Sequence, residues 1–493
     1  MQKRKSRARM VILPALVMAL VLPAVAHAAP KMKTETFDRD PGWIGVNNRS
    51  ARQGEPVQIR QDFGHSRTNH AGGAAGEMGG FISPAGEVAY FAARIEPLTF
   101  KDKFAMSGTL YVGEGGTHVL LGLFNAETVN EWRTPNTVSM RINGRGDKFF
   151  AYVEYCTSKW RAGGDTTPFP SVTDENGRWN LLGFESKKPY KWSISYDPAG
   201  NGGKGVVTAT IDDKTAICNL ESGHKEDGAT FNRIGLMNIM KSADLNSTSE
   251  IYIDNLTFNG KTETFDKDPN WEGRDNRRTY GSRIVRPWFD FGFSPTNFAG
   301  GKKKGELGGQ IFRGDCRYPE RMGCYGAKIG PLTLDKPIKA SGKVAMTRGV
   351  TDSTVLFGFY NQAQSMRSNP SQDQGVPESV LGIHLEGPSA EGFLFYPVYR
   401  LKGTDARVSA YREFPHIHPD GKSHDWSLEY DPAGADGKGQ ITVTFYGTSK
   451  TFDLHEGDKS RGATFDRFGI VTSWIDGNSV DAYWDDITYT VAQ

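Results

Sequence analysis

Residues 33–40 read KTETFDRD, and nearly the same stretch, KTETFDKD, returns at residues 261–268. The match continues downstream, because the segment DFGxSxTNxAGG at residues 62–73 recurs at residues 290–301 with the same offset. A repeat of this length is too long for a solenoid unit and is instead typical of a duplicated domain. The sequence therefore predicts one fold used twice.

The repeat extends to the end of the chain. WSISYDPAG at residues 192–200 recurs as WSLEYDPAG at residues 426–434, and each copy closes on a YxD motif, at Tyr252 and at Tyr483. We therefore expect a first domain at residues 29–260 and a second at residues 261–493.

Each copy shows strand patterns throughout. Residues 203–211 and 437–445 alternate apolar and polar side chains, and DPAG turns precede them. The 58 Gly and 25 Pro punctuate the chain, and no amphipathic helix of about 10 or more residues is evident. Many short strands in a unit of this size predict an all-β fold, with two tandem two-sheet sandwiches of the jelly-roll type.

The ends of the copies resemble those of the concanavalin A-like lectin and glucanase superfamily of jelly rolls. An opening ETFD and a closing YxD[ND][LI]T[FY] are the pattern of first and last strands that lie side by side in such sandwiches. The resemblance implies the fold and a carbohydrate partner. The ExDxxE strand that carries the chemistry of the superfamily's glucanases is absent, so their activity does not follow.

The first 28 residues read as an export signal. Five basic residues from Lys3 to Arg9 precede an apolar stretch at residues 10–25, and Ala26, His27 and Ala28 form a small-x-small cleavage pattern. No later segment has the ~18 apolar residues of a membrane helix. We expect a periplasmic or extracellular protein that is cleaved after Ala28 and not inserted in a membrane, with a short N-terminal anchor as the alternative.

The whole chain carries 59 basic and 57 acidic side chains. Because five of the basic residues belong to the export signal, the remainder is slightly acidic. This balance argues against nucleic acid as a partner, and it means that any anionic glycan would need local arginine clusters. No nucleotide-binding glycine motif is present, so no organic cofactor is expected, and the oligomeric state stays open.

Four cysteines are present, Cys156, Cys218, Cys316 and Cys324. Export permits disulfides, and four cysteines allow three pairings. Pairing within each copy is preferred, with Cys316 and Cys324 closing a short loop. Free buried thiols are the alternative.

Aspartates gather at the ends of each copy, and the candidate ligands are Asp38, Asp254, Asp266 and Asp485. Adjacent first and last strands would bring such hard oxygen donors together, so a structural Ca²⁺ is predicted. Turn-forming aspartates are the alternative explanation.

The duplicated glycine-rich segment carries polar side chains that could hydrogen-bond sugar hydroxyls, namely Asn69 and Glu77 in copy one and Asn297 and Glu306 in copy two. A loop whose polar groups bind its own backbone is the competing interpretation.

A hairpin that differs between the copies supplies the catalytic candidates. In copy two, the period of a strand places His384 and Glu386 on one face, and Tyr396 and Arg400 on one face of the returning strand. These four groups could hydrolyse a glycoside or abstract a proton beside a uronate. The matching positions of copy one include Arg141 and Asn143, so the chemistry is not duplicated.

Further substrate-binding candidates lie near this hairpin or carry exposed rings. They are Arg317, Tyr318, Arg321, Arg367, Asn369, Arg141 and Trp132.

The sequence favours an exported carbohydrate-active protein that binds a polysaccharide or oligosaccharide. Cleavage by hydrolysis or elimination would reside in the second copy and glycan binding in the first. A lectin-like protein without catalysis, and a structural or adhesive envelope protein, are the alternatives.

Overall fold

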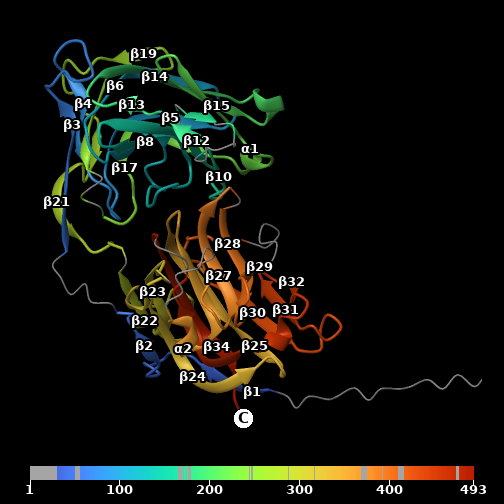
Figure 1. Ribbon diagram of the computed structural model, residues 1–493. Helices are drawn as coiled ribbons and strands as arrows, with labels where there is room; N and C mark the ends of the chain where they lie inside the picture. The colour runs from blue at the N-terminus through green and yellow to red at the C-terminus, as the bar shows by residue number, and fades with distance from the viewer. Residues whose placement is uncertain are drawn as a thin grey trace, which may run out of the picture.

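The computed structural model describes residues 30–49, 56–164, 169, 171–173, 175, 179–243, 245, 248–286, 288–315, 317–367, 375–390, 392–408, 416–473 and 477–493 (Figure 1). Antiparallel strands dominate, and they form two sandwiches of two sheets each. The predicted all-β class with two jelly-roll sandwiches is confirmed. Among the described residues, no helix has the length and hydrophobicity needed to span a membrane. The predicted export signal lies outside the described residues.

The first sandwich consists of the β6 sheet and the β8 sheet. The β6 sheet has the order β16-β15-β14-β6-β18-β4-β3-β21, and the β8 sheet has the order β10-β9-β8-β7-β17-β5-β20. The strands of the β6 sheet are β3 (Val57–Ser66), β4 (Glu77–Ile82), β6 (Phe104–Val112), β14 (Pro189–Asp197), β15 (Val206–Ile211), β16 (Lys214–Asn219), β18 (Ser249–Phe258) and β21 (Arg277–Ser282), with β19 (Lys261–Glu263) beside β18. The strands of the β8 sheet are β5 (Tyr90–Thr99), β7 (His118–Phe124), β8 (Thr137–Arg145), β9 (Lys148–Cys156), β10 (Ala162–Gly163), β17 (Thr230–Asn238) and β20 (Glu272–Arg274), with β13 (Phe184–Glu185) beside β9.

The second sandwich consists of the β25 sheet and the β27 sheet. Their orders are β22-β23-β34-β25-β30-β31-β32 and β2-β24-β33-β26-β27-β28-β29. The strands of the β25 sheet are β22 (Phe289–Ser294), β23 (Glu306–Phe312), β25 (Ile338–Gly349), β30 (His424–Asp431), β31 (Gln440–Phe445), β32 (Thr448–Asp453) and β34 (Ser479–Val491), with β1 (Lys31–Glu35) beside β34. The strands of the β27 sheet are β2 (Ile44–Val46), β24 (Cys324–Thr333), β26 (Thr354–Tyr360), β27 (Val380–Ser389), β28 (Gly392–Arg400), β29 (Arg407–Val408) and β33 (Thr464–Val471).

The remaining elements are short. They are a pair of strands, β11 (Ser171–Thr173) and β12 (Trp179–Leu181), the α-helical turns α1 (His224–Asp227) and α2 (Gln362–Ser365), and 3₁₀ turns at Asn201–Gly203, Pro319–Arg321 and Lys459–Arg461.

Each sandwich encloses its own apolar core. Residues of β6 and β8, such as Leu110 and Met140, meet in the first core, and Val344 of β25 and Ile383 of β27 meet in the second. Alternation along each strand places every second side chain in the core and the others on the outer face of the sheet. The core positions of β27 are Leu381, Ile383 and Leu385.

The opening segments of the two repeats are exchanged between the sandwiches. Strand β1, from the start of the first repeat, pairs with the final strand β34, and β2 pairs with β24. Reciprocally, β19, β20 and β21 from the start of the second repeat pair with β18, β5 and β3 of the first sandwich. Figure 1 shows the blue strands β1 and β2 in the lower body and β21 beside β3 in the upper one. Domain boundaries at residues 260 and 261 do not describe this exchange.

The two exchanged segments make equivalent contacts. Asn48 donates through Nδ2 to the carbonyl of Phe291, and Asn276 donates in the same way to the carbonyl of Phe63. Arg49 and Arg277 each donate through Nη2 to a backbone carbonyl of the body that receives them. The exchange therefore follows the sequence repeat residue by residue.

A buried carboxyl lies where the two sandwiches meet. Glu131 is fully buried, and its two oxygens accept the indole N–H of Trp160 at 2.8 Å and the backbone N–H of Gly349, from the second sandwich, at 3.2 Å. In the same region, Arg348 of the second sandwich reaches the first sandwich and donates to the backbone carbonyls of Gly86 and Met240. Burial raises the pKa of Glu131 to about 8.

This carboxyl should make the protein less stable as pH rises from 7 to 8. Because the folded-state pKa of Glu131 lies above the unfolded value, the folded state holds a proton that the unfolded state has lost, and this advantage disappears as pH rises through the folded pKa. We expect Glu131 to account for a loss of about 1 kcal/mol across that pH unit, measured by urea unfolding, and a correspondingly shallower profile for Glu131→Gln.

Asp485, whose pKa burial raises to about 7, acts in this window with the same sign, so the signal of Glu131 is the difference in slope between wild type and Glu131→Gln. The buried His118 and His384 have lowered pKa values and act with the opposite sign, but only below about pH 6.5. The exposed neighbour Glu127 is the control, because Glu127→Gln should keep the wild-type slope. Equal slopes in Glu131→Gln and wild type would contradict the prediction.

Candidate functional site

Three of the four catalytic candidates meet on the outer face of the β27 sheet. His384 and Tyr396 are directly opposite each other in the β27–β28 ladder, and Glu386 is two residues further along β27. His384 Nδ1 lies 3.2 Å from the Tyr396 hydroxyl oxygen, which lies 2.9 Å from Glu386 Oε2. The period-two placement from the sequence is reproduced because Leu381, Ile383 and Leu385 fill the core on the opposite face.

The hydrogen bonds show which atoms of His384, Tyr396 and Glu386 carry protons. A carboxylate accepts only, so the Tyr396 hydroxyl donates to Glu386, and its oxygen then accepts from the Nδ1–H of His384. Burial, followed by the charge of Arg313, lowers the pKa of His384 to about 3, so the imidazole is neutral. Its Nε2 atom is buried without a hydrogen-bond partner. His384 therefore orients Tyr396 rather than reaching a substrate.

Of these three hydrogen-bonded residues, Glu386 is the one that reaches solvent. Its side chain is 28% exposed, whereas His384 is fully buried. Burial raises the pKa of Glu386, while the hydrogen bond from Tyr396 and the charge of Arg313 oppose this effect. Glu386 is thus a carboxyl that holds its proton to higher pH than an ordinary glutamate.

Arg313 joins this cluster, although the sequence did not single it out. Its Nη2 lies 3.9 Å from Glu386 Oε1, its Nη1 lies 3.8 Å from Asp352 Oδ1, and its Nε donates to Thr354 Oγ1 at 3.1 Å. Asp352 is 62% exposed. Two carboxylates thus face the same guanidinium, one sheltered and one open to solvent.

Arg400 does not belong to the cluster, which corrects the sequence prediction. It donates through Nη1 to the carbonyl of Val376 at 2.6 Å and through Nε to that of Thr404 at 3.0 Å. Arg400 does share a face of β28 with Tyr396, but it is opposite Val380 in the ladder, four residues from the Tyr396–His384 pair. Sharing a face did not bring the two side chains together.

The first sandwich holds a different cluster at the matching positions. Arg141 and Tyr152 are directly opposite each other, as His384 and Tyr396 are, and the guanidinium lies 3.9 Å from the Tyr152 ring centre. Arg141 forms a buried ion pair with Glu154, which also accepts the indole N–H of Trp132 at 3.2 Å. This charge is neutralised internally, so the face differs in chemistry from its counterpart.

Trp132 is buried, with 7% of its surface exposed, so the prediction of an exposed aromatic platform is wrong. Its polar neighbours in sequence, Arg133 and Asn136, are buried as well. We inferred exposure of Trp132 from its polar neighbours, but the sequence does not show that these neighbours are buried too.

The duplicated glycine-rich loops are held by their own glutamates. Glu77 accepts the backbone N–H groups of His70 and Ala71, and Glu306 accepts those of Phe298 and Ala299, at 2.7 to 3.0 Å. Both carboxylates are fully buried. They therefore close the loops and are not available to a ligand, in agreement with the backbone-binding interpretation.

The other loop candidates are exposed. Asn69 and Asn297 lie on the surface, and Asn297 donates through Nδ2 to the carbonyl of Gly301 at 3.3 Å. Arg367 is also exposed. Asn369 lies outside the described residues.

Arg317, Tyr318 and Arg321 form a group around a single carboxylate. Arg317 donates to both oxygens of Asp315, at 2.8 and 2.7 Å, and Arg321 lies 3.6 Å from the same carboxylate. The Arg321 guanidinium also lies 4.8 Å from the ring centre of Tyr318, which is 44% exposed. The group is at the surface, as the sequence suggested.

The predicted calcium ligands lie apart from one another or are engaged locally. Asp254 and Asp485 are buried and each accepts the next residue's backbone N–H, while Asp38 pairs with Lys303 at 3.1 Å and Asp266 accepts from Thr264. Within the described ranges, no three His, Cys, Asp or Glu side chains form a group that could hold a metal ion. The calcium site stays a prediction from the sequence.

The three described cysteines form no disulfide. Cys156, Cys218 and Cys324 are buried with free thiols, and burial raises their pKa values. Cys316 lies outside the described residues. The preferred pairing is therefore corrected in favour of buried thiols for these three residues.

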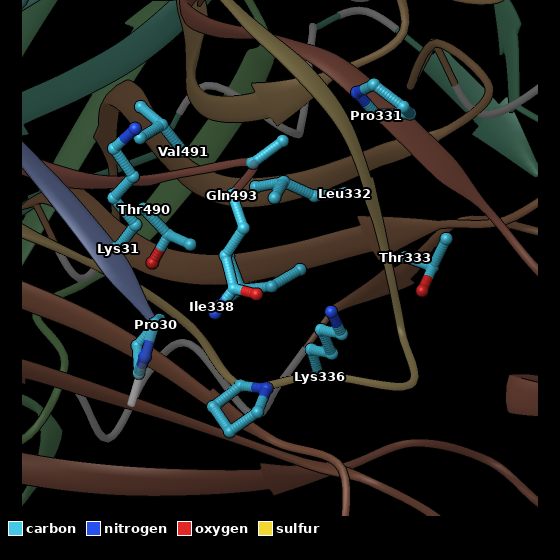
Figure 2. A pocket seen from close by; sticks show the side chains of 12 residues that line it. Pro30, Lys31, Pro331, Leu332, Thr333, Lys336, Ile338, Thr490, Val491 and Gln493 are labelled. Atoms are coloured by element: carbon cyan, nitrogen blue, oxygen red, sulfur yellow. The ribbon is translucent and has the colours of Figure 1, made fainter. Parts of the chain in front are cut away.

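A cavity of about 400 Å³ lies at the chain ends in the second sandwich (Figure 2). Leu332, Ile338 and Val491 line it together with Lys31 and Lys336. The lining includes no carboxylate side chain, imidazole or thiol, so we do not assign a reaction to it.

No protein-family model matches the chain, and no curated protein matches its sequence. Solved structures with similar folds include the carbohydrate recognition domain of Emp47p, with 10% identity, coverage of 43% of this chain and 91% of that chain, and a TM-score of 0.26. An alginate lyase from Klebsiella pneumoniae has 14% identity, coverage of 32% and 60%, and a TM-score of 0.22. Domains LG4-5 of the mouse laminin alpha1 chain have 9% identity, coverage of 84% and 94%, and a TM-score of 0.23.

Proposed function

We propose that this chain is an exported carbohydrate-active protein that hydrolyses a polysaccharide, with the chemistry on the outer face of the β27 sheet. The proposal rests on two carboxyl groups, those of Glu386 and Asp352, which both face the guanidinium of Arg313. Glu386 is sheltered and has a raised pKa, while Asp352 is open to water. Glycoside hydrolysis requires such a pair, with one carboxyl protonated and one ionised.

The roles follow from the environments. Protonated Glu386 would donate its proton to the glycosidic oxygen, and the exposed Asp352 side chain would activate water or attack the sugar. Tyr396, backed by His384, fixes the Glu386 carboxyl through its hydrogen bond. These two residues are positioning residues.

Elimination at a uronate is less well supported. A lyase needs a cation that is available to neutralise the substrate carboxylate, and Arg313 already faces two carboxylates of the protein itself. In the first sandwich, Arg141 is paired with Glu154. That sandwich would therefore assist glycan binding without cleaving, as the asymmetry between the copies suggests.

The test is a panel of soluble polysaccharides, neutral and uronate-containing, incubated with the full-length exported chain. Each reaction is assayed for new reducing ends and for the ultraviolet absorbance of unsaturated ends. We expect new reducing ends without unsaturated products. Unsaturated ends would show that the reaction is elimination and not hydrolysis. Binding without either product would show that the protein is lectin-like and not an enzyme.

A further inference from the structure

A second polar groove lies on the outer face of the β25 sheet, on the sheet opposite the Glu386 cluster. It has a volume of about 410 Å³ and is formed by β22, β23 and β34 together with Arg49 from the exchanged N-terminal segment. Neither the predicted site residues nor the proposed catalytic residues line it. The groove therefore needs an explanation of its own.

The floor of the groove is bare backbone beside an aromatic ring. Gly308 and Gly309 of β23 lie next to Tyr483 of β34, and a Cβ on either glycine would approach a neighbouring strand's carbonyl oxygen to 2.2 Å. The close strands thus require glycine, and the result is a side-chain-free surface. The half-buried Tyr483 stands at its edge and packs on Phe298 with ring centres 4.7 Å apart.

The polar lining consists mainly of hydrogen-bond acceptors. Asp290, Gln310 and Asp481 are in register across β22, β23 and β34, so their side chains share one face of the sheet. Asp290 is held by an ion pair with Arg49, but Oδ1 of Asp481 is buried and has no hydrogen-bond partner among the residues that the structure describes. A buried acceptor without a donor is costly unless a ligand supplies one.

The first sandwich lacks this combination. The residue that corresponds to Gln310 is Phe81, and the Arg60 guanidinium lies 5.5 Å from its ring centre while pairing with Asp62. The aromatic residue is retained as Tyr252, which stacks on His70 at 4.5 Å. Both copies share the strands and the aromatic residue, but only the second copy has the Gln310 amide lining an open groove.

We propose that this groove binds an uncharged sugar residue of the polysaccharide substrate. A sugar ring would place its C–H face on Tyr483 and donate hydroxyl protons to Asp481 and Asp290. Because Arg49 neutralises Asp290, Asp481 is the uncompensated carboxylate of the lining, and it disfavours an anionic sugar, so the groove selects neutral residues. The inference rests on the proposed carbohydrate function, and it adds a binding site whose lining does not include Glu386.

The test is isothermal titration of the full-length chain with cellohexaose, laminarihexaose, maltohexaose, mannohexaose and hexaguluronate. We expect at least one uncharged hexasaccharide to bind at one Tyr483-dependent site per chain, and hexaguluronate not to bind at this groove. Tyr483→Ala should weaken the binding at least tenfold, and Gln310→Phe, which introduces the residue of the first copy, at least fivefold. Tyr252→Ala is the matched control and should leave the affinity unchanged.

The outcomes separate this site from the proposed catalytic one. The groove binds sugar in this way even if the chain cleaves none, so binding of a hexasaccharide without its hydrolysis would refute the proposed function and leave the groove site intact. The proposal is overturned if no uncharged hexasaccharide binds, if Tyr252→Ala weakens binding as much as Tyr483→Ala, or if Ca²⁺ alone binds in a manner that Asp481→Asn abolishes.

Discussion

A chain consisting of residues 261–493 alone is expected to form a dimer rather than a monomer. In the intact protein, β19, β20 and β21 of this half pair with the first sandwich, and β1 and β2 complete the second. The isolated half therefore lacks its partner strands and carries strands without their partner. Because residues 261–268 repeat residues 33–40, two such halves can each supply the other's missing strands, as in domain swapping.

The measurement is light scattering coupled to size-exclusion chromatography over a range of protein concentrations. We expect twice the mass of the half-chain, with dissociation on dilution accompanied by loss of structure in circular dichroism. The control joins residues 30–54 through a short Gly/Asn turn to residues 285–493, which places the opening segment on the same chain as its body. That chain should be a monomer. A monomeric, fully folded 261–493 chain would contradict the prediction.

The repeat and the strand patterns were sufficient to predict the two sandwiches, but not the exchange of their opening segments. The motifs KTETFDRD and KTETFDKD are almost identical, so neither specifies which body it joins. In the structure, the contacts of Asn48 and Asn276 are equivalent, so they do not distinguish the two partners either. A local pattern determines which strands can pair, but it does not select between two equivalent partners.

Strand periodicity predicted the part of the candidate site that lies within one hairpin. Period two correctly grouped His384, Glu386 and Tyr396, because these residues lie within one hairpin. It failed for Arg400, which shares the face but is too far along the strand, and it could not include Arg313, which follows a strand of the other sheet. Contacts between sheets depend on packing and leave no local signal in the sequence.

Glu386→Gln is expected to lower kcat for polysaccharide hydrolysis by about 10²-fold or more, since general acid catalysis contributes about 10² to 10⁴. The amide retains an acceptor for the Tyr396 hydroxyl, so the variant should fold and bind normally. Reducing-end assays give kcat and KM, and thermal melting confirms folding. The matched control is Asn143→Gln at the corresponding position of the first sandwich, which should change kcat less than twofold.

The pH profile separates a catalytic acid from a structural one. A general acid must be protonated, so activity should fall as pH rises through the pKa of Glu386. The Tyr396 hydrogen bond stabilises the carboxylate and lowers this pKa. Tyr396→Phe removes that bond, so the alkaline limb should move to higher pH even as kcat at the optimum falls. If Glu386→Gln keeps wild-type turnover, or if Tyr396→Phe lowers activity without moving the limb, the Glu386–Tyr396 pair does not perform the acid step.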